Sequence, residues 1–231
     1  MNIPLSKRLL ACASLVATGD RVADIGCDHG YLGIHLLTKD IATYVIAADI
    51  NEMPLQSAVR NAGKFGVRDK MAFYLSDGVK NIPRDFDTLV CAGMGADTMI
   101  SILEAAPWLK DPKYRLILQC QSRRPELRKY LYENGFSIRS ETLAEDGKFI
   151  YPVTEVVYSP APPLTPGGYH ITPALLKSGS PLLPEFYERI LEGIKTTVNG
   201  LSRNGGEKYM QFQSILQELT ELEGQIYGDR C

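Results

Sequence analysis

The chain has 231 residues, a formal net charge of −2 and 45% hydrophobic residues, which suits one globular domain of ordinary size with an appendage. No apolar run is long enough to cross a bilayer, and the first eight residues lack the basic-then-apolar order of a signal peptide. Five cysteines lie far apart, with no CxxC pair and no ligand-like histidine spacing: Cys12, Cys27, Cys91, Cys120 and Cys231. We therefore expect a cytoplasmic protein with reduced core thiols, no membrane anchor and no metal site.

Apolar residues recur at helical spacing over residues 5–16, which predicts a first helix. Arg8 within it could face a ligand site, although we favour a solvent-exposed side chain. Residues 21–25 then form an apolar strand that ends at Gly26, and a second helix is expected from Tyr31. Glycine in such a turn leaves the backbone open to a ligand.

The turn has the pattern D-x-G-x-x-x-G and lacks the dinucleotide fingerprint G-x-G-x-x-G. Asp28 would repel a pyrophosphate, whereas a carboxylate beside open backbone suits a cation. The pattern resembles the first motif of S-adenosylmethionine (SAM) methyltransferases, in which acidic side chains interact with the positive charge of the methionine end. The residues expected to contact this cofactor are Asp24, Gly26, Cys27, Asp28 and Gly30. An ordinary turn that binds nothing is the alternative.

Two further strand ends carry acids. Asp49 closes an apolar strand over residues 44–49, and a carboxylate there can accept hydrogen bonds from both hydroxyls of a ribose, with Ile50 beside it. A third strand, over residues 71–75, is followed by Asp77 and Gly78, which suit contact with the adenine amino group. A strand-end cap for Asp49 and a simple turn for Asp77 remain open.

The fourth strand, over residues 87–92, runs into Gly93, Met94 and Gly95. The Asn/Asp-Pro-Pro-aromatic motif of many enzymes that methylate exocyclic amines is absent there. The glycines leave open backbone for a flat base, so Gly93 and Met94 are assigned to the cofactor site; a tight turn is the alternative.

A fifth strand over residues 115–119, a helix over 124–133 and two antiparallel strands over 136–143 and 149–158 complete the pattern. Alternating strands and helices predict an α/β fold, a doubly wound Rossmann-like SAM methyltransferase sheet. The expected strand order is 3-2-1-4-5-7-6.

Composition changes after residue 159, where prolines predict an extended connector. Two heptad-like seams follow, with a turn at Asn204-Gly205-Gly206 between them: Tyr187, Leu191, Ile194, Val198 and Leu201, then Phe212, Ile215, Leu219, Leu222 and Ile226. We expect a methyltransferase domain over 1–159, and a connector with a coiled-coil-like antiparallel helical hairpin over 160–231. The apolar seams must be buried against each other, against the sheet or against a second chain. The sequence is therefore equally compatible with a homodimer and with a monomer.

Residues 110–139 contain eight basic and three acidic residues, a net of +5. This stretch surrounds the fifth strand and its helix, at one edge of the expected active face. Arg123, Arg124 and Arg128 are therefore candidate contacts for the phosphates of an RNA substrate. A solvated helix face is the alternative.

Four features of the sequence point to one family. They are the motif D-I-G-C-D-H-G-Y-L at 24–32, the motif A-G-M-G at 92–95, the E-D-G-K turn at 145–148 and the helical hairpin. Together they resemble the bacterial tRNA (adenine-22-N1)-methyltransferases. Ala96 departs from the family, which often has a glycine there, and an acid is missing after Tyr151. The resemblance implies methylation of adenine N1 in the D-arm of tRNA, with SAM as cofactor. We assign catalysis to Asp28 and His29, and expect Tyr31 or Met94 to hold the base. The alternatives are that Asp28 only binds the SAM amino group and that His29 only caps the turn.

Two other classes stay open. A SAM-dependent methyltransferase could act on another RNA, a small molecule or a protein, with the hairpin serving dimerisation. A protein that keeps the SAM fold could also bind the cofactor without turnover.

Overall fold

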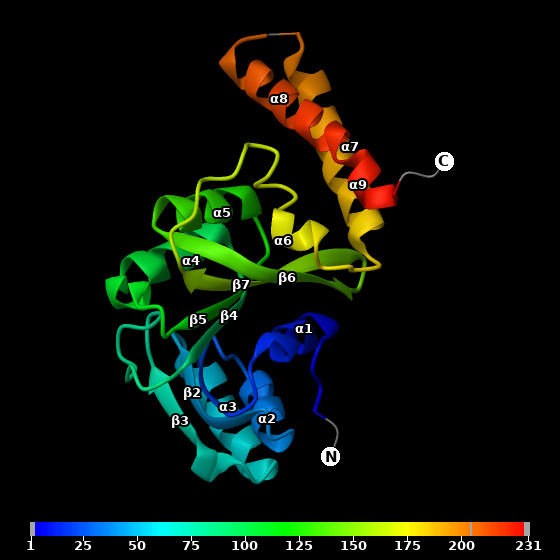
Figure 1. Ribbon diagram of the computed structural model, residues 1–231. Coiled ribbons are helices and arrows are strands. Elements are labelled where there is room, and N and C mark those ends of the chain that lie inside the picture. The colour runs from blue at the N-terminus through cyan, green and yellow to red at the C-terminus, as the bar shows by residue number, and fades with distance from the viewer. Residues whose placement is uncertain (1–2, 204, 229–231) are drawn as a thin grey trace.

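The computed structural model describes residues 3–203 and 205–228. Seven strands form one sheet with helices on both faces, and a pair of helices projects from one side of it (Figure 1). Two residues of the sequence predictions, Asn204 of the expected turn and Cys231 of the expected thiols, lie outside the described residues.

The strands are β1 (Asp20–Ile25), β2 (Ala42–Asp49), β3 (Met71–Leu75), β4 (Thr88–Met94), β5 (Arg115–Cys120), β6 (Phe136–Asp146) and β7 (Phe149–Tyr158). Their order is β3-β2-β1-β4-β5-β7-β6, which confirms the predicted order. The first five strands are parallel, and β7 lies antiparallel to both β5 and β6. β6 runs beyond its expected end because the turn at Gly147 (φ +62°) lets Asp146 pair with Phe149.

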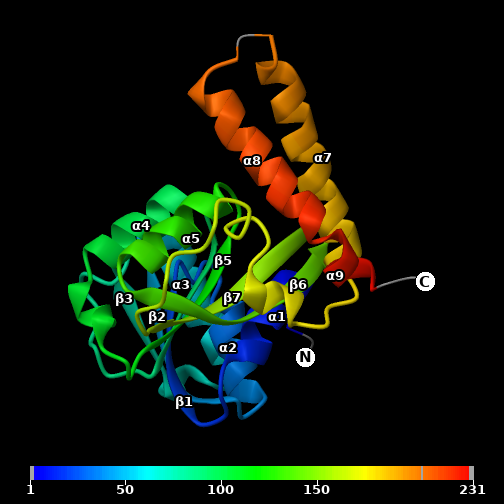
Figure 2. The same cartoon turned by 45° about the horizontal axis from the view of Figure 1, so that its top comes forward.

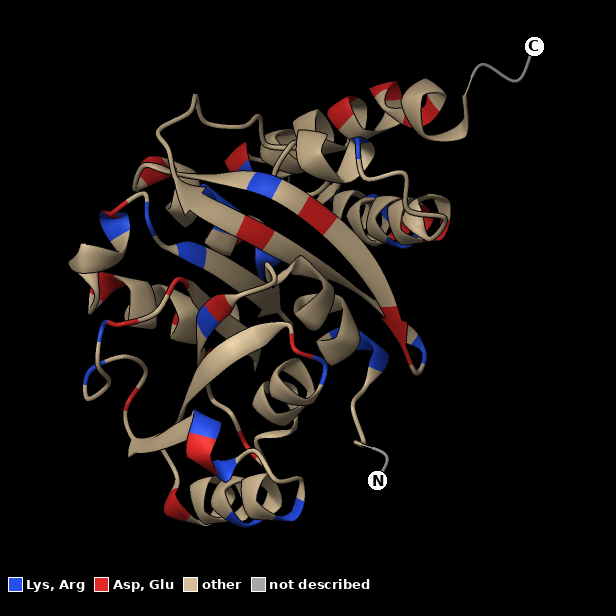
Figure 3. Cartoon of the chain, turned by 60° about the horizontal axis from the view of Figure 1, so that its bottom comes forward, with Lys and Arg blue, Asp and Glu red and all other residues tan. Residues whose placement is uncertain are grey.

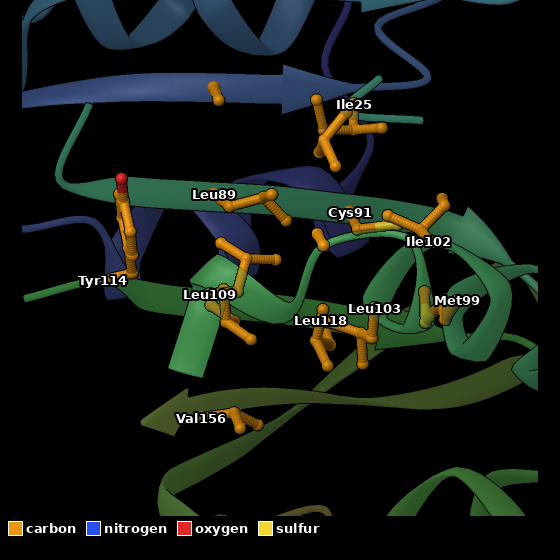
Figure 4. Close-up of a cluster of buried hydrophobic side chains, with 14 of the residues drawn as sticks. Ile25, Leu89, Cys91, Met99, Ile102, Leu103, Leu109, Tyr114, Leu118 and Val156 are labelled. Carbon is orange, nitrogen blue, oxygen red and sulfur yellow. The ribbon is translucent and has the colours of Figure 1, made fainter. Parts of the chain in front are cut away.

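The helices around the sheet are α1 (Lys7–Leu15), α2 (Tyr31–Thr38), α3 (Glu52–Lys64), α4 (Ala96–Glu104) and α5 (Arg124–Glu133), with 3-10 turns η1 (Arg68–Lys70) and η2 (Pro107–Lys110). Side chains alternate between the two faces of each strand, so each face has its own core. Helices α1, α2 and α3 cover one core, while α4 and α5 cover the other. Figure 4 shows the second core, where Leu89 and Cys91 of β4 and Leu118 of β5 pack with Met99 and Leu103 of α4. The doubly wound α/β fold is thus confirmed.

The C-terminal helices α7 (Leu183–Leu201) and α8 (Glu207–Glu221) form an antiparallel hairpin that rises from the sheet (Figure 2). Its core takes in most of the predicted seam and also two sheet residues, Leu143 of β6 and Ile150 of β7. The seams therefore bury against each other and against the sheet. Helix α8 ends at Glu221 and α9 (Glu223–Tyr227) follows, so the second seam is interrupted at Leu222.

The sequence suggested that the proline-rich connector is extended throughout. The structure shows that it is not. Ile171, Thr172 and Leu175 are buried, and Pro173 begins the short helix α6 (Pro173–Leu176). The Thr172 hydroxyl caps this helix by accepting a hydrogen bond from the Leu175 N–H (3.0 Å), and it donates to the Glu141 carboxylate of β6. The connector is thereby fastened to the sheet.

Cys12, Cys27, Cys91 and Cys120 are free and buried, as expected for core thiols. Burial raises the pKa of each, to about 12 for Cys12, so all four stay protonated. Among the described helices none combines the length and the apolar character that a membrane span needs.

Candidate active site

The loop between β1 and α2 is a tight turn built from three left-handed residues. Gly26, Asp28 and Gly30 have φ values of +73°, +50° and +72°. A Cβ at Gly26 would stand 2.4 Å from the Met94 side chain, and one at Gly30 would stand 2.8 Å from the Ala58 Cβ. Close approach as well as backbone conformation therefore explains both glycines.

A cleft of about 300 Å³ opens beside this turn, at the carboxyl ends of β1 and β4. The predicted site residues that line it are Asp24, Gly26, Cys27, Asp28, His29, Tyr31, Gly93 and Met94. The other lining residues, which sequence reasoning did not assign to the site, are Arg8, Leu9, Leu32, Ala92 and Gln121. A pocket at this edge of a parallel sheet is where α/β proteins bind nucleoside ligands.

Asp24 is the most perturbed acid of the cleft. Its side chain is 4% exposed, and its Oδ2 atom has no hydrogen-bond partner among the described residues. Burial, reinforced by the charge of Asp49, raises the pKa of Asp24 to about 7. A buried carboxylate oxygen that accepts no hydrogen bond is unfavourable, and the ammonium group of a methionine moiety would provide the missing donor.

Asp49 organises the turn through its two carboxylate oxygens. Oδ2 accepts a hydrogen bond from the Asp28 N–H (3.0 Å), and Oδ1 accepts one from the Asn51 N–H (2.9 Å). A carboxylate has about four acceptor sites, so two bonds leave capacity for a ribose diol. Ile50, next to it, is 62% exposed and offers an apolar surface to a base.

Asp77 and Gly78 do not line the cleft. The Asp77 carboxylate pairs with Lys80 at 2.5 Å. Gly78 (φ +58°) lies against Ile102 of α4, where a Cβ would come within 2.8 Å. Close packing on α4 thus accounts for Gly78, while contact of Asp77 with adenine stays a prediction.

The far wall of the cleft is a bulge at the end of β4. The pairing with β5 shifts register between Ala92 and Met94, and Gly93 (φ +85°) donates its N–H to Gln119 Oε1 (3.1 Å). Arg8 Nη1 donates to the same oxygen at 2.7 Å, so the expectation of a solvent-exposed Arg8 is wrong. The pattern of a single helix could not reveal a partner that is 111 positions away.

Asp28, His29 and Tyr31 lie at the mouth of the cleft. The side chains of Asp28 and His29 are 69% and 52% exposed, with His29 Nε2 3.6 Å from Asp28 Oδ1. The rings of His29 and Tyr31 lie 5.9 Å apart at 49°. These side chains are placed to meet a substrate that enters from solvent; their roles in catalysis and base binding stay predictions.

The basic stretch at 110–139 does not form one continuous patch. Arg115, at the amino end of β5, pairs with Asp20, which places it at the edge of the sheet opposite the cleft. Acidic residues are interspersed with basic ones along the elements (Figure 3). Arg123 donates to both oxygens of Asp97 at 2.8 and 2.9 Å.

Arg128 corrects the sequence-based prediction of an RNA contact. Its side chain is 5% exposed and forms a buried ion pair with Glu141 of β6. It also donates to the carbonyl oxygens of Tyr169 (2.9 Å) and His170 (2.8 Å). Arg128 therefore joins α5, β6 and the connector, and its guanidinium is already occupied.

The cleft fits SAM in its chemistry. It offers glycine backbone along its lining, a buried Asp24 oxygen that lacks a partner among the described residues and could accept from the amino group, and a second acid, Asp28, at its mouth. By contrast, no three His, Cys, Asp or Glu side chains gather as a metal site within residues 3–203 and 205–228.

Comparisons with known proteins agree with this geometry. A family model described as a methyltransferase domain matches residues 5–154. The tRNA (adenine(22)-N(1))-methyltransferase of Bacillus subtilis is 35% identical over 149 residues, which are 64% of this chain and 63%, under two thirds, of that enzyme.

Solved structures extend the likeness to the C-terminal helices. A proposed tRNA (m1A22) methyltransferase of Streptococcus pneumoniae superposes with a TM-score of 0.84 at 28% identity, over 94% of this chain and 99% of that one. The same protein has been solved in complex with SAM, with a TM-score of 0.82. The B. subtilis m1A22 enzyme superposes with a TM-score of 0.79 at 26% identity, over 98% of both chains. The chain therefore belongs to the methyltransferase domain family, and proteins named as tRNA m1A22 methyltransferases are among those that it resembles.

Proposed function

We propose that this protein transfers the methyl group of SAM to N1 of adenosine 22 in the D-arm of bacterial tRNA. The observation that carries the proposal is the match to m1A22 enzymes along nearly the whole chain, C-terminal helices included. The buried Oδ2 atom of Asp24, which has no partner among the described residues, supports a cationic cofactor in the cleft.

The reaction makes modest demands on the protein. SAM supplies an electrophilic methyl group, and adenine N1 carries a free lone pair near neutral pH, so no strong base is needed. The site must align N1 with the methyl group, exclude water and stabilise the positive charge that adenine gains. Asp28, exposed at the mouth, is placed to accept a hydrogen bond from the adenine N6–H and to stabilise that charge, with His29 3.6 Å away to orient it.

N1 lies on the pairing edge of adenine, so a paired target must be turned out of its helix before it reacts. Tyr31 and Met94 line the cleft and offer an aromatic ring and a thioether to hold the base. The open backbone at Gly93 lets the flat ring approach. A tRNA substrate would be met in the cytoplasm. A homodimer through α7 and α8 stays a prediction beside the monomer.

The test uses an unmodified tRNA transcript with adenosine at position 22, incubated with the protein and SAM. Mass spectrometry of the digested RNA should find 1-methyladenosine, and reverse transcription should stop at position 22, because the methyl group blocks pairing. A transcript with guanosine at position 22 is the matched control and should stay unmethylated. Methylation elsewhere would favour another substrate, and measurable SAM affinity without transfer to any cellular RNA would favour a binding protein.

A further inference from the structure

A second cleft of about 300 Å³ lies between the first turn of α5 and the helix α7. Its polar lining consists of Gln121, Ser122, Arg123, Arg124, Arg128, His170, Arg189 and Thr197. Gln121 also lines the cofactor cleft, so the two clefts adjoin. The second cleft is therefore next to the point of methyl transfer, and it is lined jointly by the sheet domain and the hairpin.

Arg124 distinguishes this cleft from the rest of the basic stretch. Six of the eight basic residues at 110–139 form ion pairs, and Lys110 donates to the Asn134 amide. Among the described residues Arg124 has neither an ion pair nor a side-chain hydrogen bond. Its guanidinium lies 5.3 Å from the centre of the Phe186 ring. Burial, then the neighbouring charge of Arg128, lowers its pKa, which reflects a cation that lacks an anion.

The acids nearest to the cleft are already engaged. Glu126 pairs with Arg123 (3.4 Å), Glu141 with Arg128, and Glu185 with Arg189 (2.5 Å). Glu218 accepts the Gly167 N–H at 2.8 Å. Of the four arginines that line the cleft, Arg124 therefore keeps its charge without a paired acid among the described residues.

Two neutral features add donors. Burial and Arg128 lower the pKa of His170 to about 4, so its imidazole is neutral and can donate one N–H at pH 7. No side chain caps the amino end of α5, where Arg123 (φ +55°) is the N-cap residue before the helix. Free N–H groups at this end favour an anion, in addition to the arginine side chains.

We propose that this cleft binds a backbone phosphate of the RNA strand next to the adenosine whose base enters the cofactor cleft, with Arg124 as its cationic donor. This inference rests on the proposed function. A partly buried guanidinium binds phosphate through two parallel N–H donors. Because one sugar joins a base to its phosphate, and Gln121 separates the clefts, one nucleotide can occupy both.

The arrangement gives the hairpin a part in substrate binding. Arg189 of α7 donates to the Lys148 carbonyl oxygen at 2.7 Å, in the turn between β6 and β7. Together with the shared apolar core, which includes Phe186, this bond holds α7 against the sheet, so the side of the cleft that faces Arg124 is fixed. A preformed site loses less entropy when it binds phosphate.

The first test measures tRNA affinity of the full chain over a range of KCl concentrations. Arg124→Gln should bind tRNA about tenfold more weakly. The slope of log Kd against log salt should fall by about 0.7–0.9, the value for one phosphate contact. SAM affinity should stay unchanged by calorimetry. Lys129→Gln, on the exposed side of the same helix, is the matched control and should leave both the affinity and the slope near wild type.

The second test changes the RNA. Neutral methylphosphonates replace, one at a time, the phosphates that flank position 22. One of them should weaken binding to the wild-type protein about tenfold and have no further effect on Arg124→Gln. Unchanged salt slopes in the variant, or losses that add at every flanking phosphate, would overturn the inference. If circular dichroism shows that Arg124→Gln is unfolded, Arg124→Met, whose apolar chain can still pack on Phe186, is used in the same cycle. Binding is measured separately from the position of methylation. Methylation at another base would therefore refute the proposed function, while the binding data would still show whether Arg124 and one phosphate act together.

Discussion

Arg8 Nη1 donates a 2.7 Å hydrogen bond to Gln119 Oε1, and this bond joins the first helix to the carboxyl end of β5. The same oxygen accepts the Gly93 N–H, so one buried amide aligns the wall of the cofactor cleft. The Gln119 Nε2 group has no partner among the described residues, which leaves a buried donor beside the cleft. The first helix is therefore part of the site as well as of the core.

Arg8→Met should destabilise the protein by about 1–3 kcal/mol, because a charged hydrogen bond to a buried group is lost. This loss corresponds to a decrease of several degrees in Tm. Lys7→Met is the control: Lys7 is exposed and lies 3.8 Å from Glu145, so Tm should barely change. Equal Tm values for Arg8→Met and wild type, measured by calorimetry, would show that the Arg8 contact contributes nothing.

Asp24→Asn should make the SAM-free protein more stable at pH 8, by ~1–4 kcal/mol. The folded pKa of Asp24, about 7, lies above its usual 3.8, so the folded state holds the proton more tightly than the unfolded state. The contribution of Asp24 to the free energy of unfolding of the wild type is therefore fully present below about pH 4 and is lost as the pH rises towards 7. The Asn variant escapes that loss, and the difference in Tm should vanish towards pH 4.

The same variant should bind SAM more weakly, because an amide carries no charge for the ammonium group. In the wild type, binding near pH 6 should release a proton from Asp24. Calorimetry in two buffers of different ionisation enthalpy measures that release. Identical binding enthalpies in both buffers would contradict the assignment of Asp24 to the cationic end of the cofactor.

Asp49→Ala should weaken SAM binding far more than tRNA binding. It removes the proposed ribose acceptor and leaves the N–H groups of Asp28 and Asn51 without their partner. Calorimetry with SAM and gel shifts with tRNA separate the two affinities. SAM affinity equal to wild type would exclude the ribose contact.

Arg128→Met should cost about 3–5 kcal/mol of folding free energy, because Glu141 would be left buried without its counterion. Denaturant unfolding measures the loss, and Lys129→Met, an exposed neighbour, should change stability by less than about 0.5 kcal/mol. The double variant Arg128→Met with Glu141→Leu should recover part of the loss. A stable single variant with impaired tRNA binding would restore the original assignment of Arg128 to RNA.

Asp28→Asn should lower kcat on tRNA with little effect on Tm. The side chain is exposed, and asparagine tolerates the left-handed φ of +50°. The variant keeps the shape of the carboxylate but not its charge, so it tests stabilisation of the methylated adenine directly. Unchanged kcat with weaker SAM binding would assign Asp28 to the cofactor alone.

Local patterns in the sequence predicted most of the fold. Alternating apolar strands and amphipathic helices determine a doubly wound sheet, because periodicity is a property of neighbouring residues. The glycine turn at 24–30 located the cofactor cleft for a similar reason: positive φ values at Gly26 and Gly30 are local requirements.

Partners that are distant along the chain could not be predicted in this way. Two sets of contacts form only once the sheet has formed. One joins Arg8 to Gln119, and the other joins Arg128 to Glu141 and to the connector. The net charge of residues 110–139 does not distinguish free from paired cations, and six of the eight basic residues in this stretch form ion pairs in the fold.

By itself, the sequence determined the kind of fold, the edge of the sheet where the ligand binds and the class of chemistry, since these follow from short-range spacing and from residue type. Only the tertiary structure decided that, among the described residues, the buried Asp24 Oδ2 atom keeps no partner and that Arg124 is the arginine of the second cleft without an anion. The physical reason is that the charge a folded protein offers to a ligand is what remains after its own long-range pairs have formed.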